Sequence, residues 1–248
     1  LFGGEPLLSL QSANFFIDST KLLAEKHGLA FNFGVTTNGT KLTRDLVEDW
    51  VPRGLTFIRV TLDGPKSIHD KRRHYRSKRK DGSFDHILKN LTDIADIPGF
   101  ELEIEVNVDA ENYLSINELL DVLDDAGLKE RIGVVPEQTL ESLGSSGKKT
   151  GCSGGSCSSC GDGGDADDRK QWFGRNTLAE NNLASAFVYV VDQIGRRGFT
   201  MPEMVGVYYP CIFVQRHHMV IDWHGDIYKC SFTIGNHDMR AGSIETGF

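Results

Sequence analysis

Hydrophobic segments of strand length alternate along this chain with segments in which apolar residues recur at helical period. This alternation is typical of βα units, in which the strands form a parallel sheet covered by helices. We expect strands at residues 1–2, 30–37, 55–62, 101–109 and 132–135. We expect helices over residues 11–27, 43–53, 84–97, 115–127 and 176–197.

Residues that suit helix ends flank several of these segments. Thr43 is a suitable N-cap, and Ser115 with Glu118 three residues later has the pattern of a capping box. Gly28 and Gly54 follow expected helices, where a left-handed residue commonly closes the last turn. These local signals agree with the periodicity.

The regular order of the units predicts an α/β fold with a partial, TIM-like (β/α) barrel, whose functional site lies at the carboxyl ends of the strands. Both periodicities stop near residue 140, where Gly, Ser, Lys and Asp predominate. We therefore assign 1–139 to the core, 140–175 to an insertion loop, 176–210 to a core helix with a connector, and 211–248 to a small final domain. In that domain, short strands are expected around a turn at His224-Gly225-Asp226.

The 248 residues have a formal net charge of −8, with 39% hydrophobic and 25% charged residues, as in an ordinary globular protein. This charge gives no reason to expect nucleic acid or a membrane as a partner. No apolar run approaches the roughly 20 residues that cross a bilayer, and no signal peptide opens the chain, so we expect a cytoplasmic protein. Its five cysteines, an odd number, favour metal ligands or free thiols over disulfides.

Polar residues and glycines follow three of the expected strands. The segments are Gly3 to Pro6, Thr36 to Gly39 and Thr61 to Pro65. Each alone is an ordinary turn sequence, but in a βα architecture these strand ends meet at one mouth. The two glycines of the first segment let the main chain approach a ligand closely, and its carbonyls with Glu5 suit an ammonium group.

Three stretches, FGGEPLL from residue 2, TTNGTKL from residue 36 and VTLDGPKSIHDKRR from residue 60, resemble in order and spacing the radical S-adenosylmethionine enzymes that mature peptides and sulfatases. The resemblance covers nearly the whole chain apart from the insertion. It implies that residues 1–139 are a radical S-adenosylmethionine core and that residues 211–248 begin a SPASM domain.

The resemblance also implies a set of cofactor-binding residues: Gly3, Gly4, Glu5, Pro6, Asn38, Thr61, Asp63 and Arg73. In the family, the segment at Gly3 binds the amino group of the cofactor's methionine. Thr61 is implied at the ribose or carboxylate, and Arg73 as a forked donor to the carboxylate. Against this, Arg72 to Lys80 carries six basic residues, a pattern typical of a solvated face. Asn107 fits an ordinary barrel-interior asparagine better than a cofactor contact.

Cys211 and Cys230, with Gly225 between them, fit the start of the SPASM pattern, in which Gly-x4-Cys follows a first cysteine after a variable gap. The resemblance implies that both thiolates hold an auxiliary [4Fe–4S] cluster, whose other ligands are expected after Phe248. Three histidines in this stretch fit surface or core positions better than metal ligands: His217, His218 and His224.

Cys152, Cys157 and Cys160 in the insertion nearly imitate the Cys-x3-Cys-x2-Cys loop of the superfamily's catalytic cluster. Their first gap is one residue too long, and the family's loop precedes the GGEP segment. We therefore expect the ligands of the catalytic [4Fe–4S] cluster upstream of Leu1, and a fragment without radical activity of its own. For the insertion, a separate metal or thiol site and a flexible loop with free thiols stay open.

The implied reaction is reductive cleavage of S-adenosylmethionine to a 5′-deoxyadenosyl radical, which abstracts hydrogen from a peptide or protein substrate. A reductant such as flavodoxin or ferredoxin is implied as a partner. Ser231 follows Cys230, where sulfatase-maturing members place a catalytic Asp, so formylglycine formation is not expected. Two other interpretations stay open: a cluster-free barrel enzyme, and a degenerate homologue that only binds a peptide.

Overall fold

The structure, a computed structural model, describes residues 1–73, 75, 82–109, 111–138, 180–202, 218–230 and 233–247. The described residues up to 138 and those from 180 to 202 belong to one compact unit, and residues 218–247 belong to a second. The boundaries expected at 139/140, 175/176 and 210/211 lie outside the described residues, so the domain assignment stays a prediction.

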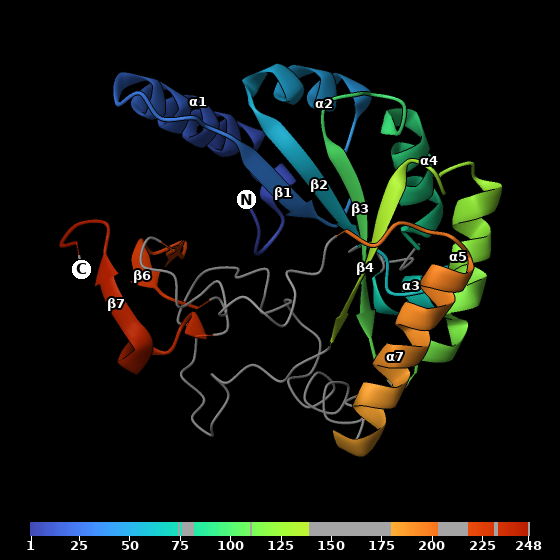
Figure 1. Ribbon diagram of the computed structural model, residues 1–248. Coiled ribbons are helices and arrows are strands. Elements are labelled where there is room, and N and C mark those ends of the chain that lie inside the picture. Colours follow the sequence, from blue (N-terminus) through green and yellow to red (C-terminus); the bar gives the residue numbers. More distant parts are fainter. Residues whose placement is uncertain are drawn as a thin grey trace. The chain divides into compact units, whose positions relative to one another are not determined.

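Four parallel strands form the sheet of the first unit, in the order β1-β2-β3-β4 (Figure 1). They are β1 (Phe33–Thr37), β2 (Leu55–Thr61), β3 (Glu101–Val108) and β4 (Ile132–Gln138). The described strands form an open sheet, as the partial barrel predicts, and no closed barrel is found among them.

The main chain of Leu1 extends this sheet beside β1. Its nitrogen donates to the carbonyl of Gly34 at 2.6 Å, and its carbonyl accepts from the amide of Thr36 at 2.8 Å. This pair of bonds is the parallel ladder pattern, although the strand expected at residues 1–2 is not among the assigned strands.

Helices form within each of the expected ranges, although several are shorter. The helices are η1 (Pro6–Ser9), α1 (Leu10–Lys26), α2 (Arg44–Trp50), η2 (Val51–Arg53), α3 (Lys66–Arg72), α4 (Phe84–Ile94), η3 (Tyr113–Ser115), α5 (Ile116–Asp125) and α7 (Glu180–Arg196). Of these, η1 and α3 were not predicted. Thr43 caps α2 as predicted, because its hydroxyl accepts a hydrogen bond from the amide of Leu46 at 3.3 Å.

The capping box predicted at Ser115 is wrong. Ser115 ends the short helix η3, and its hydroxyl donates to the carbonyl of Asn112 at 2.7 Å, so it caps no amide of α5. A turn of 3₁₀ helix leads into α5, and it replaces the extended N-cap that a capping box requires.

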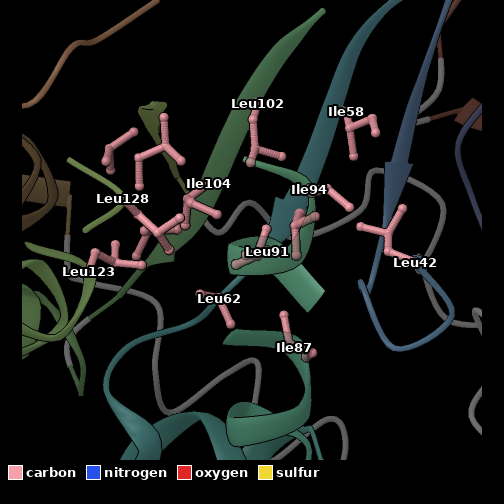
Figure 2. Packing of buried hydrophobic residues seen from close by; sticks show 14 of the residues in the cluster. Leu42, Ile58, Leu62, Ile87, Leu91, Ile94, Leu102, Ile104, Leu123 and Leu128 are labelled. Atoms are coloured by element: carbon pink, nitrogen blue, oxygen red, sulfur yellow. The ribbon is translucent and has the colours of Figure 1, made fainter. Parts of the chain in front are cut away.

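Successive side chains of each strand point to opposite faces of the sheet, and the two faces differ in polarity. One face is apolar, and its Ile58 and Leu102 belong to one buried cluster with Ile87, Leu91 and Ile94 of α4 (Figure 2). The helices α2, α5 and α7 contribute to the same core. The opposite face carries mostly polar side chains, namely Arg59, Thr61, Glu103, Glu105, Asn107 and Glu137.

The second unit contains a small antiparallel sheet, in the order β5-β6-β7. Its elements are β5 (Val220–Ile221), β6 (Asp226–Tyr228), η6 (His237–Met239) and β7 (Arg240–Ser243). The predicted turn is confirmed: Gly225 has a φ of 82°, and its amide donates to the carbonyl of Asp222 at 3.0 Å.

Candidate functional site

The segment after the first two residues turns at a pair of glycines. Gly3 and Gly4 have φ angles of 80° and 46°, a region that glycine adopts without steric cost. No hydrogen bond among the described residues involves either glycine, and a Cβ added to Gly3 would meet no heavy atom within 4 Å. The peptide groups here are open to a ligand.

Glu5 joins this segment to the carboxyl end of β1. Its Oε1 accepts hydrogen bonds from the hydroxyl of Thr37 at 2.6 Å and from the amide of Leu7 at 3.1 Å. Its Oε2 accepts one from the amide of Asn38 at 2.7 Å. Three donors thus orient the carboxylate, and Oε2 keeps capacity for one more. Pro6 follows as the first residue of η1.

Asn38 uses its side chain mainly within the turn after β1. Its Oδ1 accepts hydrogen bonds from the amide and the hydroxyl of Thr40, at 2.9 and 2.7 Å. The next residue, Gly39, has a φ of 76°, and its carbonyl accepts from Nδ2 of Asn90 at 2.9 Å. Within the described residues, the Nδ2 group of Asn38 has no partner.

Thr61, the last residue of β2, lies on the polar face of the sheet. Its hydroxyl donates to Oε1 of Glu105 on β3 at 3.4 Å. On the same face, Nε of Arg59 donates to Glu103 at 2.7 Å, and Nη1 lies 3.9 Å from Glu105. Burial raises the pKa of Glu105; the charge of Arg59 opposes this shift, and that of Glu137 adds to it.

Asp63 is a buried carboxylate that follows β2. Its carboxylate accepts hydrogen bonds from Nε of Arg73 at 2.6 Å and from Nδ2 of Asn107 at 3.0 Å. Burial alone would raise the pKa of Asp63, but the charge and the hydrogen bond of Arg73, with the bond from Asn107, hold that pKa below its usual value. The carboxylate is therefore ionised at neutral pH.

Arg73 presents the rest of its guanidinium away from this pair. Only Nε bonds to Asp63, and among the described residues Nη1 and Nη2 donate to no acceptor. The side chain is 38% exposed. Asp63 thus anchors the base of a planar donor fork whose outer groups suit a carboxylate.

His69 was not predicted as a site residue, although it lies in the VTLDGPKSIHDKRR stretch that carries the family resemblance. It is fully buried between the end of β2 and the start of α4. Its Nδ1 lies 3.4 Å from the amide of Asp63, and its Nε2 lies 3.1 Å from the hydroxyl of Ser83. That hydroxyl donates to the carbonyl of Arg73 at 2.6 Å.

Asn112 was also missed. Its buried side chain donates to the carbonyl of Asp63 at 2.7 Å and to the carbonyl of Asn107 at 2.6 Å, while Oδ1 accepts from the amide of Asp109. It therefore holds the ends of β2 and β3 together. The signal was present in the sequence, because Asn112 follows a strand end just as Asn38 and Asp63 do.

Arg72 corrects the interpretation of the basic run as a solvated face. Its side chain is only 5% exposed, and Nη2 donates to Asp109 at 3.0 Å and to Glu111 at 2.8 Å. Burial opposes the charged form, but these two carboxylates raise the pKa of Arg72 above its usual value. Residues 76–80 lie outside the described residues.

The predicted metal ligands are only partly described. Cys230 is a half-buried free thiol after β6, and Cys211 lies outside the described residues, as do His217 and the three cysteines of the insertion. Among the described residues, no three His, Cys, Asp or Glu side chains gather as a set that could hold a metal ion. His218 and His224 thus form no such group. The auxiliary site stays a prediction.

The predicted cofactor residues lie in separate groups at the carboxyl ends of the strands. Glu5 and Asn38 are bonded to each other at the end of β1, and Asp63 and Arg73 are bonded beyond β2. Thr61 bonds to Glu105 instead. No hydrogen bond among the described residues links these groups, but β1 and β2 are adjacent parallel strands. This end of the sheet offers the guanidinium fork of Arg73 and the open main-chain carbonyls of Gly3 and Gly4. The two features match the carboxylate and the ammonium group of an α-amino acid.

No family model matches the chain. A curated relative, Fe-coproporphyrin III synthase of Methanosarcina barkeri, is 25% identical over 123 residues, which are 50% of this chain and 28% of that protein. Within the described residues, no helix is long and apolar enough to span a membrane.

Solved structures of radical SAM/SPASM enzymes share the fold. Native anSMEcpe with bound AdoMet has a TM-score of 0.66 at 16% identity, and the match covers 98% of this chain and 62% of that one. The complex of anSMEcpe with AdoMet and the Kp18Cys peptide has a TM-score of 0.62 at 16% identity, covering 98% and 63%. Streptococcus suis SuiB has a TM-score of 0.56 at 17% identity, covering 97% and 51%. The chain thus spans less than two thirds of the length of each of these proteins.

Proposed function

We propose that this chain is the cofactor-binding core of a radical S-adenosylmethionine enzyme that modifies a peptide or protein. When bound, S-adenosylmethionine and its [4Fe–4S] cluster would supply the 5′-deoxyadenosyl radical that abstracts hydrogen from the substrate. The fold shared with anSMEcpe and SuiB, and the complexes of anSMEcpe with AdoMet and with a peptide, support this proposal.

One observation carries the proposal: the Arg73 fork and the open peptide groups of Gly3 and Gly4 lie at the same end of the sheet, beyond the carboxyl ends of β2 and β1. S-adenosylmethionine carries an ammonium group and a carboxylate on one carbon, and the two features have complementary charge and hydrogen-bonding capacity. Arg73 would bind the carboxylate through Nη1 and Nη2, while Glu5 and the glycine carbonyls would accept from the ammonium group.

The remaining predicted residues would shape the same site. Thr61 and Asn38 lie at the ends of adjacent strands, where a hydroxyl and an amide are available to the ribose or the carboxylate. Asp63 would act by orienting Arg73. Cys211 and Cys230 would hold an auxiliary cluster, with a flavodoxin or ferredoxin as electron donor, and a cytoplasmic location fits this chemistry.

The test uses the full-length parent protein, reconstituted anaerobically with iron and sulfide and reduced with dithionite. We expect 5′-deoxyadenosine to form from S-adenosylmethionine. We expect Arg73→Ala to raise the KM for S-adenosylmethionine by roughly 30-fold, because about 2 kcal/mol of charge-assisted bonding is lost. Arg196→Ala, a change at an exposed arginine of α7, serves as the matched control and should leave KM unchanged.

Absence of 5′-deoxyadenosine would contradict the radical mechanism. If the reconstituted protein then binds a peptide without cleaving S-adenosylmethionine, the degenerate peptide-binding homologue becomes the better interpretation. An unchanged KM in Arg73→Ala, with cleavage intact, would contradict the role of this arginine alone.

A further inference from the structure

A closed ring of hydrogen bonds lies behind the Asp63–Arg73 ion pair. Nδ1 of His69 lies 3.4 Å from the amide of Asp63, and Nε2 lies 3.1 Å from Oγ of Ser83. The Ser83 hydroxyl donates to the carbonyl of Arg73 at 2.6 Å. The amide of Arg73 donates back to the carbonyl of His69 at 2.7 Å. These bonds join the segment after β2, the last turn of α3 and the residue before α4.

The directions of these bonds fix the tautomer of His69. Ser83 has one hydroxyl proton, which it donates to the carbonyl of Arg73, so its oxygen can only accept from the imidazole. Nε2 must therefore carry a proton. The amide of Asp63 is a donor, so Nδ1 must be unprotonated. The imidazole is neutral, and both of its nitrogens have partners.

The surroundings of the ring favour this neutral form. Burial lowers the pKa of His69 to about 4, and the charges of Arg73 and Arg72 act in the same direction, while those of Asp63 and Asp70 oppose it. The ring also packs edge-on against Phe84, with the ring centroids 5.7 Å apart.

The same bonds hold Asp63 at every polar group. His69 binds its amide and Asn112 its carbonyl, while Arg73 and Asn107 bind its carboxylate. Because Nε of Arg73 is bonded to that fixed carboxylate, and the Arg73 carbonyl is held by Ser83, the guanidinium has little freedom to turn.

We infer that His69 and Ser83 are positioning residues that fix the direction of the Arg73 fork toward a ligand carboxylate. This inference rests on the proposed function, in which that carboxylate belongs to S-adenosylmethionine. The imidazole touches no ligand and acts through two main chains, so its removal loosens the fork before it removes any ligand contact.

The tautomer is tested first, without any cofactor. In ¹⁵N-histidine-labelled full-length protein at pH 7, long-range ¹H–¹⁵N spectra should show one histidine, absent in His69→Gln, as the neutral Nε2–H form. A Nδ1–H tautomer or an imidazolium at this position would overturn the hydrogen-bond ring. His27→Gln, a change at an exposed histidine after α1, should leave the assigned signal in place.

The coupling to Arg73 is tested by a double-mutant cycle on the anaerobically reconstituted full-length enzyme, with S-adenosylmethionine binding measured by equilibrium dialysis. We expect His69→Gln to weaken binding by roughly tenfold and Arg73→Ala by roughly 30-fold, and the double variant to bind no more weakly than Arg73→Ala alone. A residue that merely supports the fold would weaken binding in both backgrounds. Additive losses would therefore overturn the inference.

Ser83→Ala provides a second variant if His69→Gln does not fold, and it should show the same loss of coupling in the Arg73→Ala background. At saturating S-adenosylmethionine, both variants should keep the wild-type kcat for 5′-deoxyadenosine formation and show only a raised KM. Ser12→Ala, at an exposed serine of α1, is the control. If Arg73→Ala itself leaves binding unchanged, the proposed cofactor site fails; if Arg73→Ala weakens binding and the losses add, only the positioning inference fails.

Discussion

At the scale of single residues, the molecule concentrates its buried charge just beyond the ends of β2 and β3. Asp63 and Asp109 follow these strands, and each carboxylate is paired with one of two consecutive arginines at the end of α3. The two pairs differ in exposure. The guanidinium of Arg73 is partly open, and that of Arg72 is buried, so we expect the first pair to bind ligand and the second to stabilise the fold.

The Arg72–Asp109 pair gives a stability prediction. Asp109→Asn should lower the free energy of unfolding by about 3 kcal/mol, because it removes a buried carboxylate that pairs with the buried guanidinium of Arg72. Glu111→Gln alters a second carboxylate that pairs with Arg72; the Glu111 side chain is 51% exposed, so the loss should be less than about 1 kcal/mol. Urea unfolding followed by circular dichroism measures both. Equal losses of unfolding free energy in the two variants would contradict the prediction that the buried carboxylate stabilises the fold more than the exposed one.

His69 gives a prediction for the dependence of stability on pH. In the unfolded chain, the histidine takes up a proton below about pH 6.5, whereas in the folded protein its pKa is about 4. The unfolded state therefore binds more protons between these values, and stability is lost as the pH falls through this window, by about 3 kcal/mol in total. Above about pH 6.5, the contribution of the buried neutral His69 to the free energy of unfolding is fully present.

The measurement compares urea unfolding of the wild type and His69→Gln at several pH values between 7.5 and 4.5. The difference in unfolding free energy between the two proteins should shrink as the pH falls, because only the wild type carries the buried histidine. The exposed His27→Gln should follow the slope of the wild type. If the unfolding free energies of the wild type and His69→Gln change with pH in parallel, the lowered pKa of His69 in the folded protein is refuted.

At the scale of elements, periodicity predicted the sheet and its helices because each is amphipathic over several turns or pleats. The strict alternation of residues 101–108 predicts a strand with one apolar and one polar face, and this is what β3 shows. Helix ends were harder to predict. The Ser115 motif matches a capping box in letters, but the hydroxyl bonds back to Asn112, and only the tertiary clamp around Asn112 explains that choice.

The candidate site was predictable to a similar depth. Polar and glycine-containing segments follow successive strands, and they located the site at the carboxyl end of the sheet, because parallel strands bring their carboxyl ends together. The ring through His69 and Ser83 was not predictable from the sequence, since it depends on α3 and α4 meeting across a stretch of fourteen positions. Hydrogen bonds between distant segments leave no periodic signal.

At the scale of the whole chain, α1 has an apolar side that is exposed among the described residues. Its buried residues are Ala13 and Ile17, yet Phe15 is 74% exposed and Leu22 is 68% exposed. These two lie seven positions apart, on one stripe of the helix, and Phe16 and Leu23 continue it. A helix that is apolar on both sides is ordinarily covered on both.

An uncovered apolar stripe of this kind predicts self-association of the 248-residue chain when it is expressed alone. Sedimentation velocity at increasing concentration should show oligomers of the wild-type chain, and Phe15→Ser with Leu22→Gln should shift the population toward monomer. Because both side chains are exposed, the double variant should unfold at the urea concentration of the wild type. Leu114→Gln changes a similarly exposed leucine away from α1 and should leave the association unchanged. Association that persists undiminished in the double variant would show that another surface is responsible.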